Sequence, residues 1–185
     1  MFSVDSRNTQ LIAVAGMRGS GKDTVAKHLC SLDDRVRVLK FATPVKATLK
    51  QLFDFTDEEL EDEILKELVV PRLGFSPRQA MRTLGTEFGR TLNPDVWVNI
   101  ARESYHDNLV DGHLTIITDL RYKNEYDFVK SEGGIVIHLT TPFDVAVEHS
   151  SDVALPIEHD DFVLHNEKRD IGVFHHNIDT LIRVI

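Results

Sequence analysis

A glycine-rich stretch near the start of the chain carries the residues best suited to chemistry. Gly16-Met17-Arg18-Gly19-Ser20-Gly21-Lys22-Asp23-Thr24 has the G-x-x-x-x-G-K spacing of a phosphate-binding loop. Glycines let backbone N–H groups converge on phosphate oxygens, and a helix that begins near Lys22 directs its positive end at the same anion. Lys22 can reach the β- and γ-phosphates, and Asp23 or Thr24 can organise Mg²⁺. The motif predicts nucleotide binding; an unrelated glycine turn is the alternative.

Basic side chains elsewhere could bind a second phosphate and steady a transferred group. Arg78 and Arg82 lie four residues apart and therefore on one face of a helix. Any one basic residue is more often a solvated surface group, but beside a phosphate-binding loop the set favours a small-molecule kinase. A GTPase is disfavoured, because residues 166–170 lack the Asn-Lys-x-Asp spacing and we find no convincing Asp-x-x-Gly switch. The other candidate cations are Arg18, Lys46, Arg90 and Arg121.

Alternating strands and helices must position these residues. Short apolar runs predict strands at 11–15, 36–41, 114–118, 135–139 and 161–164. This pattern predicts an α/β fold of three layers with a mainly parallel five-stranded sheet. A capping residue before proline marks four helix starts: Thr43-Pro44, Ser76-Pro77, Asn93-Pro94 and Thr141-Pro142. Ser76 with Gln79 and Thr56 with Glu59 match capping boxes, and Met81, Leu84, Gly85, Phe88 and Leu92 form an apolar stripe at helical spacing.

An acidic segment separates two of the predicted helices. It holds eight acidic residues between Asp54 and Glu67, and Lys66 is its one basic residue. We expect a helix with a solvated acidic face and with Leu60, Ile64 and Leu68 turned inward. Metal binding or recognition of a partner is the alternative.

Length and composition bound the class of protein. The chain has 185 residues, 42% of them hydrophobic, which predicts a single domain over residues 1–185. A net charge of −9 disfavours binding to a nucleic-acid polymer. The single Cys30, the absence of an apolar run of about 20 residues and the lack of a signal-like N-terminus predict a soluble cytoplasmic protein with no membrane partner.

The sequence resembles the bacteriophage deoxynucleoside monophosphate kinases, a branch of the P-loop nucleoside monophosphate kinase fold. The resemblance covers nearly the whole chain, in order, and the Gly-Lys-Asp-Thr loop makes it specific. Beyond residues 16–24, the matching stretches are 41–46, Ser76-Pro77-Arg78, 84–87, 95–98, 118–121, Asn124-Glu125, 133–138, His149-Ser150-Ser151-Asp152, Leu155-Pro156 and 161–166.

The resemblance implies Mg²⁺-dependent transfer of the ATP γ-phosphoryl group to a deoxynucleoside monophosphate, for DNA precursor synthesis. It also implies a helical cap on the acceptor side within about 54–107, and it suggests a homodimer in the cytoplasm, that of the host if the gene belongs to a phage. The implied catalytic residues are Lys22, Arg18, Arg78 and Arg121. ATP and Mg²⁺ are implied at Gly19, Gly21, Lys22, Asp23 and Thr24, with Asp119 as a further metal ligand and Asn166 near the adenine. The acceptor is implied at Arg18, Val45, Lys46, Arg78, Gly85, Thr86, Trp97, Asp119, Arg121 and Glu125.

Several of these roles have alternatives. Asp119 ends an apolar strand, where it could order Mg²⁺ or a sugar hydroxyl, or could cap the helix that follows. Trp97 could stack on a base or belong to the core. A P-loop kinase for another small metabolite and a nucleotide-dependent regulatory binding module remain the alternative functions.

Overall fold

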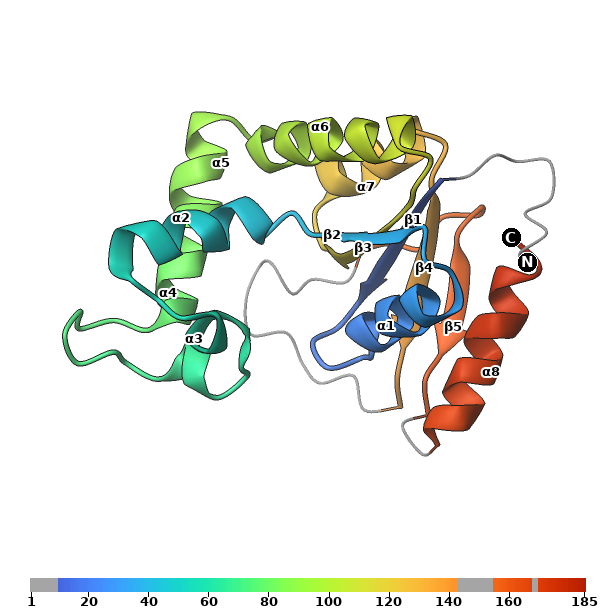
Figure 1. The fold of residues 1–185 in the computed structure, drawn as a ribbon, viewed down its shortest axis with the longest axis horizontal. Helices are drawn as coiled ribbons and strands as arrows, with labels where there is room; N and C mark the ends of the chain where they lie inside the picture. Colours follow the sequence, from blue (N-terminus) through green and yellow to red (C-terminus); the bar gives the residue numbers. More distant parts are fainter. Residues whose placement is uncertain (1–9, 143–154, 168–169) are drawn as a thin grey trace. The chain divides into compact units, whose positions relative to one another are not determined.

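Five parallel strands form the sheet of the protein, in the order β2-β3-β1-β4-β5. The computed structural model describes residues 10–142, 155–167 and 170–185. The strands are β1 (Leu11–Gly16), β2 (Val36–Leu39), β3 (Leu114–Leu120), β4 (Ile135–Thr140) and β5 (Phe162–His165), drawn in Figure 1. The predicted α/β fold is therefore confirmed. The central strand β1 ends at residue 16, and the loop of residues 17–21 connects it to α1 (Lys22–Leu32).

The chain divides into two compact units. The first comprises residues 1–40 and 102–185 and contains the whole sheet; the second comprises residues 41–101. Whether these units act as one domain with an acceptor-side cap stays a prediction. Among the described residues, no helix has both the length and the apolar character to cross a membrane.

The first unit is built in layers around its sheet (Figure 1). On one face, α1 and α8 (Ile171–Ile182) pack Val25, Leu29, Phe174 and Ile178 against apolar strand residues such as Ile137. The other face is covered by α7 (Lys123–Ser131) and the end of α6 (Val96–Val110). Because strands covered on both faces need apolar side chains on both sides, β1 is a continuous apolar run and not an alternating one.

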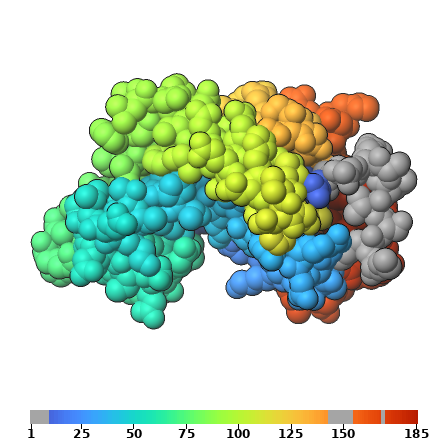
Figure 2. All heavy atoms as spheres, turned by 45° about the horizontal axis from the view of Figure 1, so that its top comes forward, coloured from blue at the N-terminus to red at the C-terminus, as the bar shows by residue number. Residues whose placement is uncertain are grey.

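The second unit packs short helices around its own core. Its elements are α2 (Thr43–Phe53), α3 (Asp57–Glu61), the 3₁₀ turn η1 (Leu65–Glu67), α4 (Pro77–Arg82), the π-helical turn η2 (Thr83–Phe88) and α5 (Gly89–Leu92). Val45, Leu49, Phe55, Leu60 and Ala80 form the buried centre. In Figure 2 the cyan and teal atoms of α2 and α3 lie against the green atoms of α4, in agreement with the contacts between these helices.

The predicted helix starts are confirmed in part. Ser76 Oγ accepts a hydrogen bond of 3.2 Å from Gln79 N, and Thr56 with Glu59 forms a complete capping box. The predictions at Thr43 and Asn93 are wrong: α2 includes Thr43 and has Ala42 at its N-cap, and α6 begins only at Val96. Asn93 instead closes a turn, its Oδ1 accepting from Asp95 N at 2.9 Å. Thr141-Pro142 stands at the edge of the described residues, and the stretch 149–152 lies outside them.

The acidic segment is not one continuous helix. Asp62 ends α3, and its Oδ1 accepts hydrogen bonds from Ile64 N and Leu65 N at 2.8 and 2.9 Å, which starts a separate turn. The prediction that three apolar residues turn inward holds for Leu60 alone, because the break changes the helical phase: Ile64 is 71% exposed and Leu68 54%.

The apolar stripe after Ser76 is also interrupted. Met81 and Leu84 pack against the core of the second unit, but Phe88 and Leu92 are exposed. The cause is η2, in which wider π-helical hydrogen bonding replaces the ordinary α-helical repeat. Residues after this turn therefore leave the face that α-helical spacing predicts.

Candidate phosphate-binding site

The loop between β1 and α1 is the candidate phosphate-binding site. Gly19 and Gly21 adopt φ of 74° and 107°, values in the region that favours glycine. Gly21 is the N-cap of α1 and makes no side-chain cap hydrogen bond. The N-terminus of a helix is a position that commonly binds anions. Arg18 and Gly19 are exposed on this loop, whereas Thr24 is half-buried in the first turn of α1.

The ammonium group of Lys22 lies over the first residues of the loop. Lys22 Nζ donates hydrogen bonds of 2.7 Å to Gly16 O and 2.8 Å to Met17 O. These contacts put the positive charge beside the glycine-rich backbone that carries the N–H groups. The structure therefore places the charge of Lys22 at the loop, and binding of a phosphate there stays a prediction.

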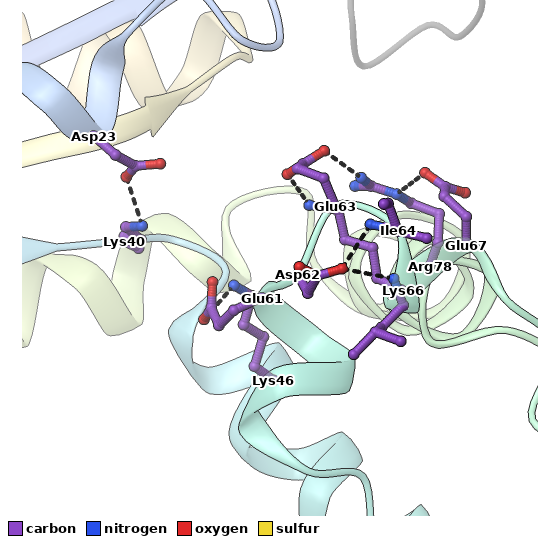
Figure 3. A network of polar contacts seen from close by, with 11 residues as sticks. Asp23, Lys40, Lys46, Glu61, Asp62, Glu63, Ile64, Lys66, Glu67 and Arg78 are labelled. Atoms are coloured by element: carbon purple, nitrogen blue, oxygen red, sulfur yellow. Dashed lines mark hydrogen bonds and ion pairs between the residues drawn. The ribbon is translucent and has the colours of Figure 1, made fainter.

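Asp23 is held by two residues that sequence reasoning did not select. Its Oδ1 accepts a hydrogen bond of 2.9 Å from Lys40 Nζ, labelled in Figure 3, and lies 3.4 Å from Thr118 Oγ1. The side chain of Asp23 is 67% exposed, so the partial desolvation that opposes its ionisation is modest. Lys40, with smaller contributions from Lys22 and Thr118, holds the pKa of Asp23 below its usual value. Asp23 is thus a carboxylate oxygen donor directly beside the loop.

A β-bulge explains why Thr118 faces Asp23. Ala13 pairs with Ile117, but Ala15 pairs with Leu120, so β3 has one extra residue in this interval. A bulge changes the direction in which the following side chains point. Thr118 is buried here and Asp119 is half-buried. The polar end of an apolar strand is the signal that could have drawn attention to Thr118.

Asn166 supports the loop from the other end of the chain. It follows β5, is 9% exposed, and donates a hydrogen bond of 2.8 Å from Nδ2 to Ser20 O. Ser20 Oγ is itself buried and has no hydrogen-bond partner among the residues that the structure describes. The predicted contact of Asn166 with adenine stays a prediction, but its position against the loop is clear.

Glu125 fixes the turn that carries Arg121. Its Oε2 accepts hydrogen bonds from Arg121 N at 2.8 Å and Tyr122 N at 3.0 Å, and the side chain is 2% exposed. Tyr122 is the N-cap of α7, so it is Glu125 whose carboxylate caps this helix. Glu125 thus holds the backbone at Arg121, the position after β3, and a role of either residue in the site stays a prediction.

The predicted acceptor residues of the second unit form a packed group and two ion pairs. Trp97 Nε1 donates a 2.6 Å hydrogen bond to Gly85 O, and Trp97 packs against the same core as Val45. Lys46 Nζ lies 2.6 Å from Glu61 Oε1. Arg78 Nε lies 3.0 Å from Glu67 Oε1 (Figure 3), and Thr86, in η2, is half-buried.

The structure therefore gathers the predicted residues into two groups. Lys22, Asp23, Thr24 and Asn166 surround the loop of the first unit, and Val45, Gly85 and Trp97 pack together in the second. In the described part of the chain, no group of three or more His, Cys, Asp or Glu side chains is arranged to hold a metal ion. A metal ion at the loop would thus depend on few protein ligands and on the oxygens of bound phosphates, as Mg²⁺ commonly does.

Comparison with known proteins gives the family. Residues 61–173 match the family described as deoxynucleotide monophosphate kinase. The chain is 32% identical over 174 residues to the "Putative deoxynucleotide monophosphate kinase" of Acanthamoeba polyphaga mimivirus, covering 85% of this chain and 89% of that protein.

Two solved structures share the fold. A sugar kinase from Janibacter sp. HTCC2649 is 18% identical with a TM-score of 0.51, and the alignment covers 93% of each chain. A "putative kinase" from Chloroflexus aurantiacus is 13% identical with a TM-score of 0.54, covering 97% of this chain and 99% of that one. The family match and the mimivirus relative agree with each other and with the five-stranded parallel sheet. The chain therefore belongs to the deoxynucleotide monophosphate kinase family and is a nucleotide kinase.

Proposed function

We propose that the enzyme transfers the γ-phosphoryl group of ATP to a deoxynucleoside monophosphate and releases ADP and the deoxynucleoside diphosphate. The observation that supports this most is the loop between β1 and α1, where Lys22 Nζ lies over the backbone of Gly16 and Met17. An oxygen of the acceptor monophosphate attacks the γ-phosphorus, and the bond from that phosphorus to the β,γ-bridging oxygen breaks. The bridging oxygen keeps the electron pair and leaves on ADP.

The protein contributes positioning and charge, because phosphoryl transfer needs little covalent help. The N–H groups of the loop hold the β- and γ-phosphates, and Lys22 neutralises charge that develops on the transferred group. An acceptor phosphate is already anionic, so the site needs no strong general base. Arg18 and Arg121 supply further positive charge near the transferred group.

The residues beside the loop fit Mg²⁺. Asp23 is an ionised carboxylate with its pKa below the usual value, and hard oxygen ligands of this kind suit Mg²⁺. Asp23 and Thr24 would hold the ion, directly or through water, with Asp119 as a further ligand. When bound, Mg²⁺ neutralises charge on the β- and γ-phosphates. The hydroxyl of Thr118 keeps Asp23 oriented in this role.

A product assay tests the proposal. The purified chain is incubated with ATP and Mg²⁺ and with each deoxynucleoside and nucleoside monophosphate in turn, and products are separated by anion-exchange chromatography. We expect stoichiometric ADP and a deoxynucleoside diphosphate. Inorganic phosphate without a new diphosphate would show an NTPase or a regulatory switch. Turnover with another phosphorylated metabolite alone, or no turnover, would contradict the proposed acceptor.

A further inference from the structure

Two carboxylates of the acidic segment contact the guanidinium of Arg78 in different ways. Glu67 Oε1 lies 3.0 Å from Nε, within hydrogen-bond distance, whereas Glu63 Oε2 lies 4.0 Å from Nη2, which is an ion pair without a hydrogen bond. Figure 3 shows the guanidinium between the two carboxylates. The side chain of Arg78 is 19% exposed. The strong contact is therefore made at Nε, and the weak one at a terminal nitrogen.

The difference matters because of the geometry of arginine. A guanidinium has five N–H donors in a rigid plane and binds phosphate through two of them in parallel. A carboxylate that accepts a hydrogen bond from Nε fixes the plane of the guanidinium. The terminal N–H groups, one on each Nη, can then bind a second anion. Glu67 occupies the Nε position, so it orients Arg78 without using the terminal pair.

The backbone around Glu67 is itself held in place. Asp62 starts the turn η1 by accepting hydrogen bonds from Ile64 N and Leu65 N, and Glu67 N donates to Ile64 O at 3.0 Å. Lys66, 7% exposed, is ion-paired with Glu63. Because Glu63 has this second cation, it keeps a partner when it separates from Arg78.

We propose that Glu67 is a positioning residue, which holds Arg78 by Nε so that the terminal nitrogens receive the phosphate of the acceptor nucleotide, while Glu63 gives way to that phosphate. This inference rests on the proposed function. The acidic segment thereby takes part in recognition of the acceptor through one residue that orients and one that is displaced. Before the phosphate binds, the two positive charges of Arg78 and Lys66 balance the two negative charges of Glu63 and Glu67.

A double-mutant cycle tests the role of Glu67. Replacing Glu67→Gln removes the charge that fixes Nε, and we expect the KM of the deoxynucleoside monophosphate to rise about 5- to 20-fold, with the KM of ATP unchanged. Arg78→Ala should raise the acceptor KM at least as much. Because Glu67 acts through Arg78, Glu67→Gln should have no further effect on kcat/KM in the Arg78→Ala background.

Asp57→Asn is the matched control. It removes one negative charge from the same segment, and its partner is Lys50, at 2.6 Å, not Arg78. It should leave the acceptor KM unchanged. Glu67→Asp keeps the carboxylate and should fall between the wild type and Glu67→Gln. Thermal unfolding of each variant confirms that it is folded at the assay temperature.

The possible outcomes separate the hypotheses. A lower acceptor KM in Glu67→Gln would show that Glu67 competes with the phosphate, and an undiminished effect in the Arg78→Ala background would show that it acts elsewhere; either overturns the inference. An equal rise in the acceptor KM of Asp57→Asn would show that the effect of Glu67→Gln is a general effect of charge, which also overturns the inference. Failure of the proposed function is distinct, because the wild-type chain would then form no deoxynucleoside diphosphate.

Discussion

The side-chain amide of Asn166 donates a hydrogen bond of 2.8 Å to the backbone carbonyl of Ser20, 146 residues earlier in the chain. A Cβ atom at Gly21 would lie 2.8 Å from the same amide nitrogen, so Asn166 also lies against the backbone at Gly21. Asn166 N in turn donates to Thr140 O at 2.9 Å, which ties this contact to β4. The residue after β5 thus helps to fix the conformation of the loop between β1 and α1.

Replacing Asn166→Ala should weaken the binding of ATP and leave the acceptor unaffected. The change leaves the carbonyl of Ser20 without its buried donor, which costs about 1–3 kcal/mol and corresponds to roughly a 5- to 150-fold rise in the KM of ATP if the cost falls on the loop. Asn166→Asp should be worse, because a carboxylate would face that carbonyl. Steady-state kinetics with each substrate varied in turn measures both constants.

Val163→Ala is the control for this pair of variants, since Val163 is a 53% exposed residue of β5, the strand that Asn166 follows. Its kinetic constants should match the wild type. A rise in the acceptor KM of Asn166→Ala, with the KM of ATP unchanged, would contradict the role in the loop.

Lys22→Ala should abolish most of the turnover and leave the fold intact. The ammonium of Lys22 donates to two loop carbonyls, and the side chain is polar and half-buried, so we expect its removal to cost little packing. Loss of a charge that acts in the transition state lowers kcat by about 10²–10³-fold. Formation of diphosphate and thermal unfolding are measured together, with the exposed Lys27→Ala on α1 as control. An unchanged kcat would refute the role of Lys22.

The sheet and the loop could be predicted because local patterns determine them. Short apolar runs identify strands that are buried on both faces, and the glycine spacing identifies the loop, whose backbone needs positive φ at Gly19 and Gly21. Capping predictions succeeded where the side-chain oxygen reaches a backbone N–H, as at Ser76 and Thr56, and failed at Thr43, which lies inside its helix.

Features that depend on long-range pairing could not be read from the chain. The bulge that turns Thr118 toward Asp23 exists only because β3 is paired with β1. The ion pairs of Arg78 depend on how η1 folds beside α4, whereas continuous helical spacing predicts a merely solvated acidic face. The π-helical turn before Gly89 likewise leaves no periodic signal in the apolar stripe.

Asp161 is the centre of a buried polar network in the first unit. Its carboxylate, with no exposed surface, accepts hydrogen bonds from the hydroxyl of Tyr126 at 3.0 and 3.1 Å, from Lys130 Nζ at 3.3 Å and from Glu158 N at 3.0 Å. Nε2 of His138 lies 3.0 Å away. Burial opposes ionisation, but these hydrogen bonds together hold the pKa of Asp161 below its usual value.

The lowered pKa of Asp161 predicts acid-sensitive stability. A carboxyl with a lower pKa in the folded state stabilises the fold fully above its unfolded value of about 3.9, and this stabilisation is lost as the pH falls through the folded value. The free energy of unfolding of the wild type should therefore decrease below about pH 4. Asp161→Asn should be less stable by about 2–4 kcal/mol at pH 7, with a shallower decrease below pH 4.

Asp160→Asn provides the comparison for Asp161. Asp160 also pairs with Lys130, at 2.6 Å, but its side chain is 67% exposed and solvent screens the pair, so its replacement should destabilise the fold much less than that of Asp161. Urea unfolding followed by circular dichroism from pH 3 to 7 measures all three proteins. Parallel curves for the wild type and Asp161→Asn would show that the buried carboxylate does not carry the pH dependence.

Gly89→Ala should destabilise the second unit through Trp97. A Cβ atom at Gly89 would lie 2.4 Å from Cζ2 and 2.9 Å from Cε2 of the indole, and 3.0 Å from Leu84 O. The indole is held by its hydrogen bond to Gly85 O and packs against the core of this unit, so it cannot move without a cost. Overpacking of this kind costs about 1–3 kcal/mol.

Gly85→Ala separates this clash from the general effect of adding a methyl group to a helical glycine. At Gly85 a Cβ would meet the methyl groups of Val45 at 3.6 and 3.7 Å, which is ordinary van der Waals contact. The backbone of the Gly85→Ala variant would also lose less conformational entropy on folding than that of the wild type. The free energy of unfolding of this variant should therefore stay the same or rise by up to about 1 kcal/mol. Urea unfolding monitored by the fluorescence of Trp97, the one tryptophan of the chain, measures both variants at the affected side chain. Equal free energies of unfolding for Gly89→Ala and Gly85→Ala would mean that the indole can shift to make room for the new methyl group. The close approach at Gly89 would then cost no stability.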